Sequence, residues 1–155
     1  MITKPKAQKL RVRKWLNNIN GGTPTINTTD KIAEPIAHAI TMQVMLDPDE
    51  EPLIASGRNG TEWCLLTTAR LIWFQDEMIR SLPWRNILGA QQPPKQAAKI
   101  IRGEMEKDQI SDLEIFEASN QKHLIRLNPG SAYYITWSAI LAFCRYSRRP
   151  DPIPL

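Results

Sequence analysis

The sequence has little of what most enzymes use for catalysis. Its 155 residues include only two histidines, His38 and His123, and two cysteines, Cys64 and Cys144. No His-x-x-x-His, Cys-x-x-Cys or neighbouring His–Glu pair gives the spacing of metal ligands. A glycine-rich phosphate loop and a Gly-x-Ser-x-Gly nucleophile elbow are also absent. The sequence therefore predicts a protein that is not an enzyme, binds no cofactor or metal and has no small-molecule substrate.

Long apolar runs are also missing. The most apolar stretch, residues 131–144, is shorter than the ~20 residues that a membrane-spanning helix needs. The N-terminus is charged and lacks the apolar core of a secretory signal. Both cysteines lie in apolar runs far apart in the chain, which favours buried free thiols over a disulfide. We therefore expect a cytoplasmic protein. Peripheral membrane attachment or an organelle transit peptide are the alternatives, because the N-terminus bears arginines and no acid.

Acidic residues are absent from the first 16 positions. The whole chain has 20 Lys and Arg against 16 Asp and Glu, a net charge of +4. Six cations lie in this N-terminal arm, so the remaining chain sums to −2. The arm is predicted to bind an anionic partner, either a membrane surface or a nucleic acid, or else to serve only as a solubilising tail. The candidate residues are Lys4, Lys6, Lys9, Arg11, Arg13, Lys14 and the adjacent Trp15.

Two helices are predicted before residue 47. The first is a short basic helix over residues 5–19, with apolar residues at helical spacing. The second runs from about Asp30, a candidate N-cap, to Leu46, with Pro35 near its start. The apolar stripes are Val12, Trp15, Leu16 and Ile19 in the first helix, and Ile32, Ile36, Ile40 and Val44 in the second.

An acidic loop follows the second helix. Asp47, Asp49, Glu50 and Glu51 surround Pro48 and precede Pro52, and they lack an EF-hand pattern. We interpret this cluster as a solvated loop rather than a cation site.

From residue 53 onward, short strands alternate with turn signals. Between the fifth and sixth strands, residues 93–110 indicate a helical insertion that Gly103 weakens. The seven expected strands are Leu53–Ser56, Thr61–Thr67, Arg70–Gln75, Met78–Trp84, Ile87–Gln92, Asp112–Ala118 and His123–Leu127.

A final helix is predicted from Ser131 to Tyr146, and it carries two apolar stripes. One stripe should pack on the strands. The other needs a second cover, either the helix over residues 30–46 of the same chain, which we favour, or a partner. The stripes are Tyr133, Trp137, Ile140, Leu141 and Cys144, and Ile135, Ala139, Ala142 and Tyr146.

One hairpin carries a family resemblance. Residues 64–74, CLLTTARLIWF, and residues 82–87, LPWRNI, resemble the pleckstrin-homology (PH)-like superfold, in particular GRAM and bacterial PH-like domains. Trp137 lies where closing helices of that superfold often place an aromatic. The resemblance covers residues 52–147. It implies an α+β fold with a seven-stranded antiparallel barrel closed by the C-terminal helix, beside a helical extension over residues 1–51 and a Pro-rich tail over residues 148–155.

The resemblance implies a binding module. Phosphoinositide-binding members carry several cations between their first two strands, whereas this chain offers Arg58 beside Glu62, so specific phosphoinositide binding is not expected. Our first interpretation is a non-enzymatic adaptor that binds a protein through a sheet edge, the second helix stripe or the basic arm. The alternatives are a membrane or nucleic-acid module acting through the arm, and an immunity or inhibitor protein. The interface candidates are Trp84, Arg85, Ile135, Ala139, Ala142 and Tyr146.

Overall fold

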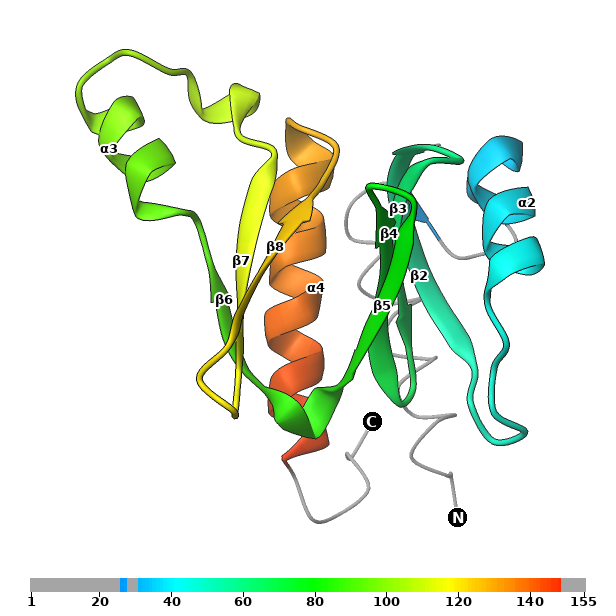
Figure 1. The fold of residues 1–155 in the computed structure, drawn as a ribbon. Helices are drawn as coiled ribbons and strands as arrows, with labels where there is room; N and C mark the ends of the chain where they lie inside the picture. Colours follow the sequence, from blue (N-terminus) through cyan, green and yellow to red (C-terminus); the bar gives the residue numbers. More distant parts are fainter. Residues whose placement is uncertain (1–25, 28–30, 149–155) are drawn as a thin grey trace.

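The chain folds into two antiparallel sheets with a long helix between them (Figure 1). The computed structural model describes residues 26–27 and 31–148. The first sheet has the strand order β1-β2-β3-β4-β5, and the second has the order β6-β7-β8. The strands are β1 Ile26–Asn27, β2 Pro52–Asn59, β3 Glu62–Thr67, β4 Arg70–Gln75, β5 Met78–Pro83, β6 Ile87–Gln91, β7 Asp112–Glu117 and β8 Lys122–Arg126. The helices are α2 Glu34–Gln43, α3 Pro94–Ile101 and α4 Ser131–Ser147, with 3₁₀ turns η1 Trp84–Asn86 and η2 Lys107–Gln109.

The seven predicted strands are confirmed as β2 to β8, each within about three residues of its expected ends. Side chains alternate between two buried faces along the β3–β4 hairpin. Trp63 and Leu65 of β3 belong to the apolar cluster under α2, while Cys64 belongs to the cluster around α4. Leu71 and Trp73 of β4 enter the α4 cluster in the same way. Period-two side-chain alternation accounts for this division between two buried faces.

The predicted closed barrel is wrong. Among the described strands, none of the first sheet pairs with one of the second. The turn η1 leads from β5 to β6 at the corner, and α4 occupies the space between the sheets (Figure 1). A small barrel closes when its last strand pairs with its first around an interior that side chains alone can fill. Here a helix about 10 Å across lies in that space, and it keeps the sheets apart.

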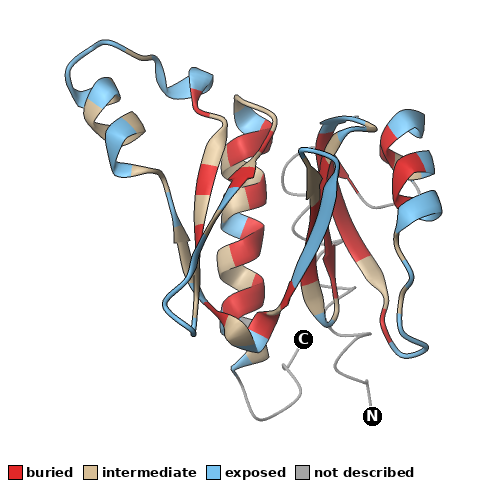
Figure 2. Cartoon of the chain, in the orientation of Figure 1, coloured by how far each residue is buried: buried red, intermediate tan, exposed pale blue. Residues whose placement is uncertain are grey.

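Helix α4 is bound to both sheets. The Thr136 Oγ1 lies 2.9 Å from the Ser56 Oγ of β2, and the Trp137 Nε1–H donates to the Ala90 carbonyl of β6 at 3.0 Å. Tyr133 is fully buried and donates its hydroxyl to the Asp112 carbonyl at 2.8 Å. Figure 2 shows buried residues on several sides of α4, as a helix packed between two sheets requires.

Helix α2 does not cover α4, so the favoured cover for the second stripe is wrong. Ile36 and Ile40 of α2 pack instead against Ala55, Leu65 and Ile72 on the outer face of the first sheet. The sheet therefore lies between α2 and α4 (Figure 1). Because strands β2 to β4 are apolar on both faces, the sheet needs a cover on each side.

The boundaries of α2 also differ from the prediction. The helix runs from Glu34 to Gln43, with Ala33 at its N-cap and Pro35 in its first turn. The start next to Pro35 is confirmed, because proline is tolerated only in the first turn. The expected N-cap, Asp30, and the predicted helix over residues 5–19 lie outside the described residues.

The insertion forms α3, which projects from the body and has no buried residue (Figure 2). Gly103 adopts a positive φ of 73°, and the Glu104 N–H donates to the Lys99 carbonyl at 2.8 Å. Gly103 therefore ends the helix at its C-terminus, a position where glycine is favoured. In the part of the chain that is described, no helix is long and apolar enough to cross a membrane.

Side chains join the two sheets where main-chain pairing does not. The Gln75 side chain at the end of β4 donates to the Leu124 carbonyl at 2.7 Å and accepts from the Arg126 N–H at 2.9 Å. It thereby occupies the outer edge of β8 as a short strand would. The Arg126 guanidinium binds Glu62 at 3.0 Å and the Asp76 carboxylate. These contacts hold the second sheet against the β4–β5 turn.

The Gln75 bridge predicts a stability effect. Gln75→Ala removes both hydrogen bonds and leaves two main-chain groups of β8 without a protein partner. We expect unfolding to become easier by about 1 kcal/mol, measured by urea denaturation. Gln91→Ala, which removes an exposed amide bonded to Glu114, is the matched control and should change stability less. Equal effects of the two substitutions would contradict the bridging role.

Candidate functional site

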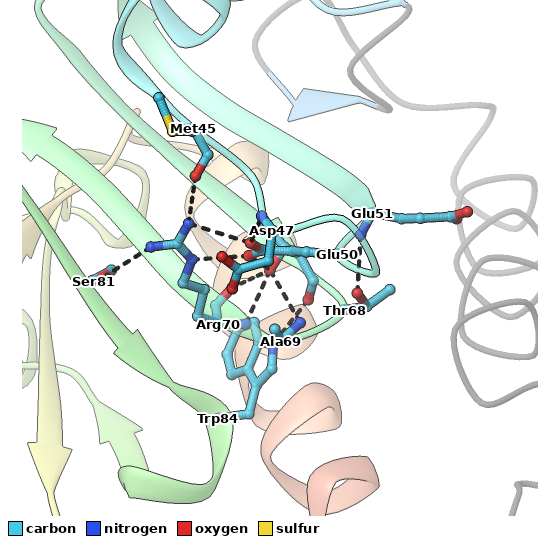
Figure 3. A network of polar contacts seen from close by, with 10 residues as sticks. Met45, Asp47, Glu50, Glu51, Thr68, Ala69, Arg70, Ser81 and Trp84 are labelled. Carbon is cyan, nitrogen blue, oxygen red and sulfur yellow. Dashed lines mark hydrogen bonds and ion pairs between the residues drawn. The ribbon is translucent and has the colours of Figure 1, made fainter.

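A buried ion pair connects the α2–β2 loop to the β3–β4 hairpin (Figure 3). The Glu50 side chain is only 1% exposed. Its carboxylate accepts hydrogen bonds from the Arg70 Nε at 2.9 Å, the Thr67 hydroxyl at 2.6 Å and the Asp47 N–H at 3.1 Å. Arg70 also donates to Glu50 Oε2 at 3.2 Å and to the Met45 carbonyl at 2.9 Å. The guanidinium therefore fixes both ends of the loop.

Thr67 organises the hairpin turn at the same point. Its Oγ1 accepts from the Ala69 and Arg70 N–H groups at 3.1 and 3.0 Å, so the side chain stabilises the turn. The Thr67 carbonyl accepts from the Trp84 Nε1–H at 2.8 Å. Trp84 is 2% exposed and packs edge-on against Phe143 of α4. The turn is thus linked to α4 through one indole ring.

The polar contacts determine the charge of Glu50. Burial raises the pKa of its carboxyl, but the hydrogen bonds from Arg70, Thr67 and Asp47 and the Arg70 charge outweigh burial, so the pKa is lowered. The hydrogen bond to Glu50 raises the pKa of Arg70 further. Both groups stay ionised near neutral pH. Hydrogen bonds to a carboxylate favour its charged form in this way.

The sequence predicts that Glu50 belongs to a solvated acidic loop, and this prediction is wrong because the Glu50 side chain is buried. The available signal was the spacing Asp47-x-x-Glu50, because a glutamate side chain three residues on can bond back to a main-chain N–H. The partner Arg70 is 20 residues away in sequence, so only the fold brings the two together. Thr67 and Arg70 lie in the hairpin that carries the resemblance to PH-like domains, and in this structure both bind Glu50.

An apolar groove of about 510 Å³ lies beside α2, in the size range of ligand and peptide pockets. Met42 and Met45 are neighbours in the chain of groove residues but do not line the groove, and they are 71% and 88% exposed. The exposed Asp47 and Asp49 follow directly in the chain. The residues that line the groove are Ala37, Ile40, Thr41, Val44, Leu46, Pro52 and Leu65.

Strand β5 forms an open edge of the first sheet. The Trp84 N–H donates to the Ala69 carbonyl at 3.2 Å, and the antiparallel register continues without a shift to the pair Gln75–Met78. Hydrogen-bonded and non-hydrogen-bonded pairs alternate along such a ladder. Ile79 and Ser81 therefore direct their N–H and C=O groups away from β4. Four consecutive residues of β5, from Met78 to Ser81, are exposed.

Side chains protect both edge strands of the second sheet, β6 and β8. The Arg148 guanidinium donates to the Ile87 and Leu88 carbonyls of β6 at 2.7 and 3.1 Å, and Trp137 donates to Ala90. Gln75 occupies β8. Among the described residues, no such contact reaches the outward main-chain groups of β5. An exposed, regular edge of this kind is a template for another strand.

The structure does not collect the predicted interface candidates into one surface. Trp84 and Ala139 are buried, Ile135 and Ala142 are half-buried, and Arg85 is exposed. The side chain of Tyr146 is outside the described residues, as are the arm residues Lys4, Lys6, Lys9, Arg11, Arg13, Lys14 and Trp15. Trp84 is a core residue rather than an exposed interface residue. Partner binding by the other candidates stays a prediction.

Reactive groups are inaccessible or engaged. Cys64 and Cys144 are buried free thiols, as predicted, and burial raises their pKa to about 12 and about 11. His123 Nε2 lies 2.8 Å from the Glu117 carboxylate. Within the described ranges, no group of three His, Cys, Asp or Glu side chains is placed to hold a metal ion. What this geometry supports is binding through the groove or the open edge.

Comparison with known protein families, with curated proteins and with solved structures finds no match to this chain.

The Glu50–Arg70 pair predicts a pH-dependent stability. The folded pKa of Glu50 is below the unfolded value of about 4.3, so its stabilisation is complete above that value and is lost as the pH falls through the folded pKa. Glu50→Gln should lower the free energy of unfolding by roughly 1.5–3 kcal/mol at pH 7. The difference from wild type should narrow below about pH 4, as followed by denaturation at several pH values.

The exposed neighbour supplies the control. Asp49→Asn removes the same charge from the same loop and should leave stability at pH 7 nearly unchanged, because an exposed charge contributes little. A loss as large for Asp49→Asn as for Glu50→Gln would indicate general loop charge rather than the buried pair.

Proposed function

We propose that this protein is a non-enzymatic binding module or adaptor, and that the open edge of β5 pairs with an extended segment of a protein partner. The observation that carries the proposal is the unprotected edge itself. Two pairs of main-chain groups, at Ile79 and Ser81, point outward from a strand without a bulge. A bound segment would satisfy them and add a strand to the sheet.

The side chains of β5 support the same proposal. Met78 and Ile79 are 52% and 46% exposed. Arg80 and Ser81 supply polar groups along the same strand. Main-chain pairing provides affinity in this type of recognition, and alternating side chains provide specificity. A cytoplasmic location and a relationship to PH-like domains are part of this proposal.

The alternatives stay predictions. Membrane or nucleic-acid binding would act through residues 4–15, outside the described residues. An inhibitor or immunity role is compatible with the same open edge, because strand addition can also block a partner.

Ile79→Pro is the direct test. Proline removes the outward N–H of Ile79 without removing a bond to β4, and proline is tolerated on a free strand edge. We expect the variant to keep its fold and melting behaviour while proteins captured by the immobilised wild-type chain from its own cells are lost by at least tenfold. Quantitative mass spectrometry of the captured proteins measures this.

Ile79→Thr is the matched control, since it changes the same side chain but retains the main-chain donor. It should preserve capture by pairing. If Ile79→Pro captures the same proteins as wild type, the edge is not the binding surface. Equal losses for both variants would assign binding to the Ile79 side chain instead.

A further inference from the structure

The groove beside α2 differs from the open edge in position and in chemistry. It lies on the outer face of the first sheet, with the buried Ile40 and Leu65 lining it and the half-buried Val44 and Leu46 beside them. We infer that this groove binds the basic amphipathic segment of the same chain, residues 4–19. Apolar fit, charge and reach each support this occupant.

The first argument is apolar fit. Val12, Trp15, Leu16 and Ile19 recur at the spacing of one helix face. Such a face needs an apolar counterpart, since a short helix in water gains most of its stability from packing. The groove offers one, because Ile40, Val44, Leu46 and Leu65 line it.

The second argument is charge. Residues 31–52 contain five acids against one lysine, whereas residues 1–29 contain six cations and no acid. Arg70, which contacts the loop after α2, already binds Glu50. The exposed Asp47 and Asp49 follow Leu46 of the groove wall. A basic segment lying in the groove would therefore meet opposite charge, which sets its orientation as well as its affinity.

The third argument is reach. Ile26 pairs with Ser56 of β2, and Pro52 of the groove lies four residues further along that strand, about 13 Å away. Six residues connect Ile19 to Ile26, and an extended chain of that length spans up to about 23 Å. The segment can therefore reach the groove within its own chain.

An engineered disulfide tests the placement in the full-length protein. Leu16→Cys combined with Thr41→Cys places one thiol on the segment and one in the wall of the groove, because Thr41 is exposed and lines it. Oxidised glutathione should cross-link this pair within one chain at least tenfold faster than Leu16→Cys combined with Ile101→Cys. Ile101 is a suitable control because it is 86% exposed on α3, on the opposite side of the molecule (Figure 1). The native Cys64 and Cys144 are buried and should not compete.

Each outcome decides the proposal. Fast cross-linking within a single chain, independent of protein concentration, supports it. Disulfide-linked dimers would show that the segment binds a second copy, and equal rates for the two pairs would show that it does not visit the groove. Either result would overturn the inference while leaving strand addition at β5 untouched.

A substitution in the groove gives a second measurement. Val44→Lys introduces a cation into the apolar wall, and hydrogen exchange of residues 10–19 should then accelerate at least tenfold relative to wild type. His38→Lys adds the same charge to an exposed position of α2 outside the groove and should leave their exchange unchanged. Rapid exchange of residues 10–19 already in the wild type would contradict the inference.

Discussion

The ion pair between Glu50 and Arg70 is the contact on which the arrangement of the first sheet depends. A carboxylate that is almost fully buried is stable only if its charge and lone pairs are satisfied. Glu50 accepts four hydrogen bonds, two from the Arg70 Nε and Nη2, one from the Thr67 hydroxyl and one from the Asp47 N–H. Removal of either charged partner would leave the other uncompensated. The pair therefore fixes the loop after α2 to the hairpin, and with it the position of α2 and of the groove.

Helix α4 determines the second large feature, the separation of the sheets. Its aromatic side chains fill the space that a closed barrel would leave to strand pairing, and Gln75 and Arg126 replace the missing main-chain bonds at one side. A closed barrel has no strand edges, whereas two separate sheets have several. Side chains protect β6 and β8, whereas none of the described residues pairs with the outer edge of β5. The separation of the two sheets replaces the expected barrel, and it also leaves the strand edge that is the candidate binding site.

The two faces of the first sheet pack against different elements. Its inner face packs with α4 and the second sheet, and its outer face packs with α2. Because α2 spans only ten residues, the described part of the chain covers the outer face incompletely and leaves an apolar groove between the end of the helix and the strands. The acidic loop that follows α2 gives this groove a charge opposite to that of the N-terminal arm.

The sequence by itself determined the seven strands, the start of α2 near Pro35, the long final helix and the two buried thiols, because period-two and period-3.6 patterns and proline act locally. Tertiary structure decided the rest. The pairing of Glu50 with Arg70, the side of the sheet that α2 covers and the failure of the barrel to close all depend on residues far apart in the chain. An apolar stripe specifies that a surface must be buried, but not which of several apolar surfaces buries it. The open edge of β5 and the groove follow from that choice, so no local pattern could have indicated them.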